Sequence, residues 1–364
     1  MIRLQVWVPK PVGCSPGQRF RLEQWAPHLE KDHGIVLEFF PFESPALTDV
    51  LYRDGHFLQK ARHVLGDALR RRTSLQAARN YHGAVIYREA AMLGPAIYER
   101  LLKRSGVPIV YDFDDAIWLP PAGTRNGFFS RLKFEGKTKT ICRLSSTVVV
   151  GNVYLAAFAS QYNARVAIVP TTIELEKYPL QPPLPQDDPF VIAWSGSVTT
   201  LPYLEPVRSA IEKFAQSRRV KVRILCNAPL ARPFAHAENE FVQWQEAGEA
   251  EAIGRAHVGI MPLPNDDFTR GKCGLKALQY MAVGLPVVLS PIEVNREIVR
   301  HDETGLWAST EGEWISALER LASDRALRSR LGQAGRKIVE NHYTAATGAR
   351  LFAEAVRAGL SFAA

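Results

Sequence analysis

Residues 268–290 hold the densest group of side chains able to bind an anion, in the sequence FTRGKCGLKALQYMAVGLPVVLS. A basic loop that contains glycines leads into a predicted helix and then into a buried strand. The start of a helix presents N–H groups without partners inside the helix, and it carries the positive end of the helix dipole. Both features favour phosphate oxygens. We therefore predict a phosphate site here, against the alternative of a solvated basic helix start. Its predicted ligands are three cations and two residues at the helix start: Arg270, Lys272, Gly274, Leu275 and Lys276.

The spacing of the two lysines supports this prediction. Lys272 and Lys276 are four residues apart, so they would share a helix face and repel each other by about 0.2–0.5 kcal/mol if the helix already included Lys272. The nearest acidic residues, Asp266 and Asp267, stand at the loop entrance, and no local carboxylate is expected to neutralise the two lysines. A bound anion would remove the repulsion.

A second glycine turn follows the predicted strand FVIAW. Gly196 and Ser197 stand at the carboxyl end of this strand, where open parallel sheets bind ligands. A glycine at this point lets a phosphate or a sugar come close to the backbone. An ordinary turn from strand to helix would contain the same residues, so both interpretations stay open on these residues alone.

Three carboxylates end the predicted strand in VPIVYDFDDAIW. Asp112, Asp114 and Asp115 would lie at the carboxyl edge of the sheet, and a D-x-D-D run is able to bind a divalent cation through oxygen ligands. Arg88 and Glu89 follow another predicted strand, AVIY, and are either further site residues or members of a structural ion pair.

The elements that must position these residues alternate along the chain. In the first half, short runs of β-branched and aromatic residues alternate with helical patterns, which predicts βαβ crossovers and a parallel sheet. Residues 178–189, YPLQPPLPQDDP, are dense in proline and indicate an extended linker, because proline disfavours helix and removes backbone donors. The alternation restarts at FVIAWSG. We therefore predict an α/β chain of two doubly wound parallel-sheet domains that face a central cleft.

Bulk properties agree with two globular domains. At 364 residues the chain is long enough for two cores, and its formal charge of +8 favours anionic partners such as nucleotides, phospholipid headgroups or nucleic acid. The longest apolar stretch, residues 281–289, is about half of the ~20 residues that a membrane-spanning helix requires. We expect no transmembrane segment and no secretion signal. The dispersed cysteines indicate free thiols and a cytoplasmic protein.

The sequence resembles the retaining family 4 glycosyltransferases (glycosyl transferase group 1), which have the GT-B architecture. The runs GLKALQYMAVGLPVV and DETGLWA are similar to the donor-binding region of that family, where E-G-F-G-L-x-x-L-E-A-M-A-x-G-x-P-V-V is typical. Further similar motifs extend over nearly the whole chain: SPGQRFR, VYDFDDAIW, VPTT, WSGSVTT, GIMPL and LGQAGRKIVE. The resemblance implies Rossmann-like domains at residues 1–180, on the acceptor side, and at residues 181–340, which bind the nucleotide sugar. Residues 341–364 would form a helix that packs back on the first domain.

The sequence departs from the family pattern at two glutamates. The family has them eight positions apart, the first near the donor sugar and the second usually gripping the ribose; here Gly271 and Gln279 stand in their places. Gln279 is able to hydrogen-bond a ribose hydroxyl, whereas Gly271 has no side chain for the sugar. The family's arginine and lysine after the first strand of the C-terminal domain are also absent. We infer a subgroup with a basic R-G-K-C-G-L-K loop, in which Arg270, Lys272 and Lys276 neutralise the diphosphate.

The resemblance also implies roles for a loop near the N-terminus. In GT-B enzymes the loop that corresponds to CSPGQRFR faces the cleft. This makes Gly17 and Arg19 candidates for contact with the donor phosphate or with the acceptor. Arg21 is expected to pair with Glu23 or with another neighbour on its own helix.

For the mechanism, the resemblance implies retention of anomeric configuration without a protein nucleophile. Basic groups would stabilise the departing nucleoside diphosphate, which is the main catalytic effect. Because basic residues and the helix dipole usually neutralise the diphosphate in GT-B enzymes, the resemblance also implies that no essential metal is needed. Asp114 or Asp115 would orient the acceptor hydroxyl or stabilise the cationic centre. The resemblance also favours contact of Gly196 and Ser197 with the donor.

A basic amphipathic helix is predicted between His56 and Tyr81. Its apolar residues follow helical spacing, and basic residues dominate the remainder. Such a helix either lies on an anionic membrane or turns its apolar side to the core and its basic side to solvent, and we favour the core-facing alternative slightly. A second basic run in the same half comprises Arg131, Lys133, Lys137, Lys139 and Arg143.

The combined prediction is a cytoplasmic glycosyltransferase that serves cell-envelope polysaccharide biosynthesis, with a peripheral position on the inner face of the membrane as an open alternative. It would move a sugar from a nucleoside diphosphate sugar to a glycan or lipid-linked acceptor. The missing glutamates leave a second interpretation, a catalytically silent relative that binds nucleotide sugar or glycan. A nucleic-acid-binding protein is the weakest interpretation, because the sequence contains no recognised nucleic-acid module.

Overall fold

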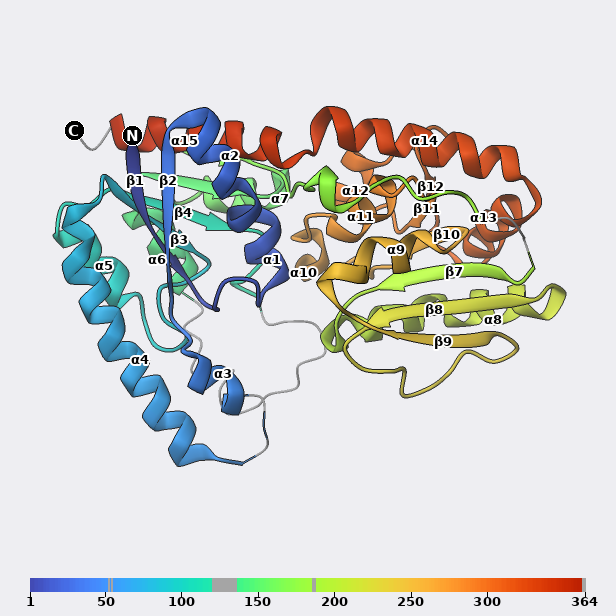
Figure 1. The fold of residues 1–364 in the computed structure, drawn as a ribbon, viewed down its shortest axis with the longest axis horizontal. Coiled ribbons are helices and arrows are strands. Elements are labelled where there is room, and N and C mark those ends of the chain that lie inside the picture. The colour runs from blue at the N-terminus through green and yellow to red at the C-terminus, as the bar shows by residue number, and fades with distance from the viewer. Residues whose placement is uncertain (52, 54, 120–135, 185–187, 362–364) are drawn as a thin grey trace. The chain divides into compact units, whose positions relative to one another are not determined.

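The computed structural model describes residues 1–51, 53, 55–119, 136–184 and 188–361, which form two compact units. The first unit is Met1–Thr171 together with Ala345–Ala364, and the second is Thr172–Thr344. Each unit contains a six-stranded parallel sheet with flanking helices, which confirms the predicted α/β fold class (Figure 1). Arg131, Lys133 and residues 185–187 of the proline-rich segment lie outside the described residues.

The first unit has the strand order β2-β1-β3-β4-β5-β6. Its strands are β1 (Ile2–Val8), β2 (Ile35–Pro41), β3 (Gly83–Tyr87), β4 (Ile109–Phe113), β5 (Thr147–Val150) and β6 (Val166–Ile168). Its helices are α1 (Pro16–Gln18), α2 (Gln24–His33), α3 (Pro45–Leu51), α4 (Phe57–Ala77), α5 (Ile97–Arg104), α6 (Lys137–Leu144), α7 (Val153–Ala159) and α15 (Ala345–Ser361). A π-helical turn, Arg19–Glu23, joins α1 to α2.

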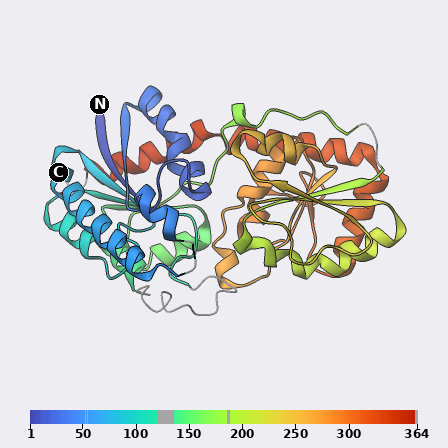
Figure 2. The ribbon, with the colours of Figure 1, turned by 60° about the horizontal axis from the view of Figure 1, so that its bottom comes forward.

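The second unit has the strand order β12-β11-β10-β7-β8-β9. Its strands are β7 (Phe190–Ser195), β8 (Val220–Cys226), β9 (Glu238–Gln243), β10 (Val258–Met261), β11 (Val287–Leu289) and β12 (Leu306–Trp307). Its helices are α8 (Arg208–Ser217), α9 (Glu249–Gly254), α10 (Asp267–Arg270), α11 (Leu275–Ala282), α12 (Glu293–Ile298), α13 (Glu311–Ser323) and α14 (Arg325–His342). Figure 2 shows helices on both faces of this twisted sheet.

The strand orders place a switch point in each sheet. In the first unit the chain goes from β1 to β2 on one side and then returns to β3 on the other side, so the switch point lies between β1 and β3. In the second unit it lies between β7 and β10. Open α/β sheets bind ligands outside the carboxyl ends of the strands at such points. The segments after these four strands are therefore the first places to look for a site.

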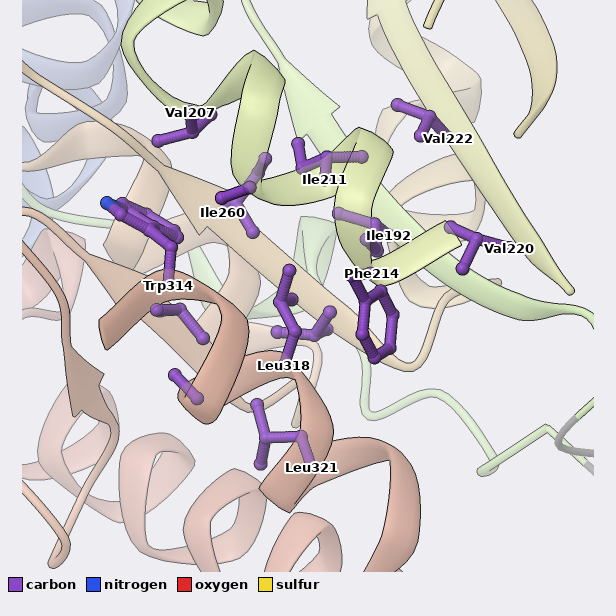
Figure 3. Close-up of a cluster of buried hydrophobic side chains, with 14 of the residues drawn as sticks. Ile192, Val207, Ile211, Phe214, Val220, Val222, Ile260, Trp314, Leu318 and Leu321 are labelled. Carbon is purple, nitrogen blue, oxygen red and sulfur yellow. The ribbon is translucent and has the colours of Figure 1, made fainter. Parts of the chain in front are cut away.

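Alternation along the strands builds the cores. In β7, Phe190, Ile192 and Trp194 belong to the core formed with α8 and α13 (Figure 3), which also includes Phe214 of α8 and Leu318 of α13. The intervening β7 residues belong to the opposite face, because successive side chains of a strand alternate. The sheet is buried on both faces, which explains the near-continuous apolar sequence of β7.

The same alternation in β1 gives the first unit two different faces. Leu4 and Val6 pack in a core with α2 and α15, in which Trp25 and Phe352 bring their ring centroids to 5.4 Å. The intervening Gln5 contacts α4 on the other face. The last helix of the chain, α15, therefore completes the core of the first unit.

Helix α4 turns its largest apolar residues outward. They are between 59% and 90% exposed: Phe57, Leu58, Leu65 and Leu69. The buried residues of this helix are instead Asp67, Arg71 and Ser74. The core-facing interpretation of its apolar side is therefore wrong for these four residues, because polar contacts dock the helix. Among the described residues, no helix has the length and the apolar character needed to cross a bilayer.

Candidate functional site

The switch point of the second unit brings the Gly196 turn and the basic loop together. Gly196 follows β7, and the basic loop follows β10, which pairs with β7. Tyr280 of α11 connects the two strands: the Ser195 amide donates to its hydroxyl at 2.8 Å, and its ring occupies the space above Gly259 of β10. A Cβ on Gly259 would lie 2.4 Å from that ring, so the glycine is what lets α11 approach the sheet.

The turn after β7 is closely packed around its glycine. A Cβ on Gly196 would lie 2.3 Å from the Trp194 ring and 2.7 Å from the Thr200 hydroxyl. Ser197 then caps the following 3₁₀ segment, Val198–Val207, through reciprocal hydrogen bonds with Thr200. The exposed Ser197 and Thr199 hydroxyls lie 2.9 Å apart. Two hydroxyls and a glycine backbone therefore border the switch point.

The basic loop begins with a capped single turn of helix. Asp266 accepts a hydrogen bond from the Thr269 amide at 2.8 Å and so caps α10. Arg270 ends this turn, and its guanidinium lies 3.6 Å from the Asp267 carboxylate and 3.8 Å from that of Glu293. Two carboxylates therefore partly neutralise Arg270. Its side chain is still 38% exposed.

Helix α11 begins directly after Gly274, the glycine that lies between Lys272 and Lys276 in the sequence. Gly274 has φ = 69°, and a Cβ there would lie 2.2 Å from Ile298, so both conformation and space require glycine. Because the helix begins at Leu275, Lys272 precedes it and does not share a helix face with Lys276. The Lys272 Nζ lies 4.6 Å from the Phe268 ring centroid.

Lys276 links the basic loop to the turn after β7. Its Nζ lies 5.2 Å from the ring centroid of Trp194, the same ring that packs against Gly196. The lysine stands in the first turn of α11, where the helix dipole is positive. A glycine backbone, a helix start and a lysine therefore meet at one sheet edge, which is a suitable arrangement for a phosphate.

Gln279 points away from this edge. Its side chain is 2% exposed and its amide donates to the Tyr178 hydroxyl at 2.8 Å. Tyr178 in turn donates to Glu249, which also accepts from the Trp244 indole at 2.8 Å. The amide that we expected at a ribose hydroxyl is thus held in a buried network. Leu275 is partly exposed at the helix start.

The switch point of the first unit is filled by an ion-pair network. Arg88 follows β3 with φ = 61°, a conformation that non-glycine residues rarely adopt. Its backbone is fixed on both sides, since its N–H donates to the backbone carbonyl of Asp112 and its own carbonyl accepts from the Tyr111 hydroxyl. Its guanidinium bridges Asp114 at 2.7 Å and Asp115 at 2.8 Å. The structural ion pair that sequence left open for Arg88 is therefore present.

Gly17 lets the loop after β1 close against this network. A Cβ on Gly17 would lie 2.4 Å from the Tyr87 hydroxyl and 2.6 Å from Asp114. Tyr87 donates to Asp114 at 2.8 Å. Burial alone would raise the pKa of Asp114, but the charges of Arg88 and Arg21, with the hydrogen bonds from Tyr87 and Arg88, together outweigh burial and lower this pKa below its ordinary value.

A second buried pair lies beside it. Arg21 and Asp112 are both fully buried and their side chains approach to 2.6 Å, while Arg21 also donates to the Val169 carbonyl. The expectation that Arg21 pairs with a neighbour on its own helix is therefore wrong. Glu23 instead accepts from Gln18 and from the Gly13 amide. Arg19 is buried, with 4% of its surface exposed.

The three carboxylates of the D-x-D-D run thus face arginines. Asp112 pairs with Arg21, and both other carboxylates pair with Arg88. Nowhere in the described parts of the chain do three or more His, Cys, Asp or Glu side chains gather in a way that would hold a metal ion. In the same unit Glu89 pairs with Lys137 at 3.0 Å.

Sequence reasoning missed the partners that fix the site. Tyr280 and Gly259, which hold α11 on the sheet, lie in apolar runs whose pattern signals only a core. Glu293 was part of a polar stretch, but its approach to Arg270 depends on β11 lying next to β10. Tyr87, the partner of Asp114, ends an ordinary strand pattern, and no local signal could have identified it.

The second unit matches a known family. Residues 190–324 match the family model described as "Glycosyl transferases group 1", and this range contains both the Gly196 turn and the basic loop. No curated protein matches the sequence.

Solved structures share the fold of the whole chain at low sequence identity. Sucrose-phosphate synthase from Thermosynechococcus elongatus has a TM-score of 0.69 and 14% identity, with 98% of each chain covered. Anabaena HepE in complex with UDP and glucose has a TM-score of 0.64 and 13% identity, over 98% of this chain and 100% of that chain. The lipopolysaccharide outer core galactosyltransferase WaaB has a TM-score of 0.64 and 13% identity, over 98% and 99%. The chain therefore has the GT-B fold of solved glycosyltransferases, and residues 190–324 of its second unit are similar to the glycosyl transferase group 1 model.

Proposed function

We propose that the chain is a glycosyltransferase that moves a sugar from a nucleoside diphosphate sugar to a glycan or lipid-linked acceptor with retention of anomeric configuration. The observation that carries this proposal is the meeting of the Gly196 turn with the basic loop at the switch point of the second unit. Neither segment alone would distinguish a ligand site from an ordinary turn.

The donor would bind through its diphosphate. Gly196 allows close approach to the backbone, and the start of α11 supplies N–H groups and a positive dipole end. Arg270, Lys272 and Lys276 supply full charges, of which Arg270 is balanced in part by Glu293. The complex of HepE with UDP and glucose supports a uridine diphosphate sugar as the donor. The buried Gln279 is left out of this site.

Catalysis would then consist mainly of stabilising the departing diphosphate. Preorganised cations stabilise negative charge that develops in the transition state, and no metal or protein nucleophile is required for that effect. In the first unit we assign acceptor contact to Arg88 and Asp115, whose side chains are 29% and 18% exposed. Asp114 is a positioning residue for Arg88, and Gly17 allows their loop to close. Arg19, which is buried, has no assigned role in contact with substrate.

The class of acceptor is proposed from the name of one structural neighbour. WaaB is named as a lipopolysaccharide galactosyltransferase, and this supports a saccharide-bearing acceptor of the cell envelope. The missing glutamate at Gly271 removes one usual contact to the donor sugar, so the donor sugar itself stays unassigned. Glu293, whose carboxylate lies 3.8 Å from the Arg270 guanidinium, is our candidate for a sugar contact.

A thermal-shift screen would test the donor site. The full chain and the variant Lys272→Ala/Lys276→Ala would be mixed with UDP, GDP, ADP, TDP and their sugars, with and without magnesium. We expect one nucleoside diphosphate to raise the melting temperature of the wild type without magnesium, and the variant to lose that shift. Lys139→Ala/Lys337→Ala, which removes two exposed lysines elsewhere, is the matched control.

Turnover separates the enzyme from a silent binder. Release of nucleoside diphosphate from the stabilising nucleotide sugar, in the presence of saccharide acceptors, would support catalysis. Binding without release for any acceptor tested would contradict the proposed activity. No stabilisation by any nucleotide would contradict the donor site itself.

A further inference from the structure

The outward face of α4 combines leucines with arginines on one helical stripe. Leu58, Arg62, Leu65, Leu69 and Arg72 follow one another at spacings of three or four residues, so they share a face. All five residues are exposed. No other helix in the described parts of the chain carries more than two large exposed apolar residues.

Polar anchors fix which face of α4 turns outward. Arg71 donates to the carbonyls of Phe40 and Val8 at 2.8 and 3.3 Å, and Asp67 accepts from the amide and hydroxyl of Ser44. The Ser74 carbonyl accepts from Gln5. These bonds run from the buried side of α4 to the first unit. The helix cannot rotate its leucines inward without breaking them.

The packing of α4 leaves the stripe uncovered. Figure 1 shows α4 on the outside of the first unit with α5 beside it, and the Tyr98 hydroxyl of α5 donates to the Ala68 carbonyl at 2.6 Å. The three leucines of the stripe are 59–90% exposed, so most of their apolar surface is left uncovered by the first unit. This apolar surface is available for contact with another surface.

The charge of α4 identifies that surface. Asp67 is the one acidic residue of the helix, and it is buried and paired with Arg70 at 3.0 Å. The exposed face therefore carries apolar and basic side chains without a carboxylate. We propose that α4 docks the protein on an anionic phospholipid membrane, with its leucines in the interface and its arginines at the headgroups.

The chemistry of both residue types fits this occupant. A basic amphipathic helix buries its apolar face at the boundary between headgroups and acyl chains, and arginines extend their heads toward the phosphates. In a dimer formed through α4, the basic faces of the two copies would lie against each other. Repulsion between their like charges disfavours such a dimer. This inference is independent of the proposed catalytic activity.

Vesicle flotation with the full chain tests the proposal. The probes are vesicles of phosphatidylcholine alone and vesicles with about one-third phosphatidylglycerol, at low and high salt. We expect binding to the anionic vesicles alone, weakened by salt. Leu58→Gln/Leu65→Gln/Leu69→Gln should reduce the partition coefficient at least about tenfold, because three leucines leave the interface. Arg62→Gln/Arg72→Gln should reduce it about fivefold for each charge removed.

Matched variants keep the test specific. Val153→Gln/Ile168→Gln changes two exposed apolar residues outside α4 and should bind as the wild type does. The melting temperatures of all variants should agree within a few degrees, since every changed residue is exposed. Equal binding to neutral and anionic vesicles, or unchanged binding of the leucine variant, would overturn the proposal. A third outcome would also overturn it: the wild type is a dimer in sedimentation velocity, the leucine variant is a monomer, and the wild type binds no vesicles.

Discussion

The two switch points of the molecule use charge in opposite ways. In the first unit, Arg21 and Asp112 are fully buried and matched, and Arg88 bridges two aspartates against Gly17. In the second unit, the basic side chains stand on a partly exposed loop beside a helix start, and Arg270 is 38% exposed.

The difference suggests how to distinguish charges that stabilise the fold from charges that we propose to bind a ligand. A buried pair has already exchanged water for a protein partner, and removal of one member leaves an uncompensated charge. A partly exposed cation at a helix start keeps room for an anion. The fully buried pair of Arg21 and Asp112 should therefore control folding, and the cations of the basic loop should control nucleotide binding.

The largest expected effect is on the buried pair. Arg21→Ala should lower the free energy of unfolding by about 3–5 kcal/mol, because Asp112 stays buried without its partner. Chemical denaturation measures this change. Replacing both residues, as in Arg21→Met/Asp112→Leu, should restore much of the lost stability.

An exposed pair on the same sheet serves as the control. Arg3 of β1 and Glu38 of β2 also form an ion pair at 2.6 Å, but the Arg3 side chain is 51% exposed. Arg3→Ala should cost less than about 1 kcal/mol. Equal losses for Arg3→Ala and Arg21→Ala would remove the distinction between the two kinds of charge.

The next effect concerns the start of α11. Gly274→Ala should destabilise the second unit by about 2–4 kcal/mol and abolish nucleotide binding, because the new Cβ meets Ile298 at a positive φ. Gly34→Ala has a similar φ of 65° with nothing within 4 Å, and it should cost only about 1 kcal/mol. Denaturation and nucleotide titration of both variants would check this. Nucleotide binding by Gly274→Ala at wild-type affinity would count against a site at this helix start.

The smallest effect is a pH dependence in the first unit. Because Arg88 and Arg21, with the hydrogen bonds from Tyr87 and Arg88, lower the pKa of Asp114 in spite of burial, ionised Asp114 stabilises the fold above the ordinary aspartate pKa of about 3.9. This contribution is lost as the pH falls below that value toward the lowered pKa. The difference in unfolding free energy between wild type and Asp114→Asn should therefore shrink on acidification. A difference that stays constant between pH 6 and 3 would show that the Asp114 charge contributes nothing.

Much of the fold could be predicted, because it depends on local patterns. Alternating strands and helices predicted both sheets, and the Gly196 turn and the basic loop follow strands as expected. Spacing also predicted a helix near residues 56–81, which the structure places at Phe57–Ala77.

The remainder depends on tertiary contacts that leave no local signal. Arg21 and Asp112 are 91 positions apart, and they meet although β3 separates β1 from β4 in the sheet. Gln279 turns inward because Tyr178 offers a hydroxyl from a distant segment. Helical spacing in α4 defines two faces, but only the bonds of Arg71 and Asp67 decide which one is buried.

The most direct test of the central claim is a calorimetric titration with one nucleotide in three forms. The nucleoside diphosphate that most stabilises the chain, its monophosphate and the free nucleoside would be titrated into the wild type and into Lys272→Ala/Lys276→Ala. If these lysines bind the diphosphate, wild-type affinity should fall at least about tenfold with each phosphate removed, since hydrogen bonds to charged groups contribute about 1.5–3 kcal/mol each. The variant should bind all three forms weakly and alike. Equal affinities of the wild type for the diphosphate and the nucleoside would contradict the account.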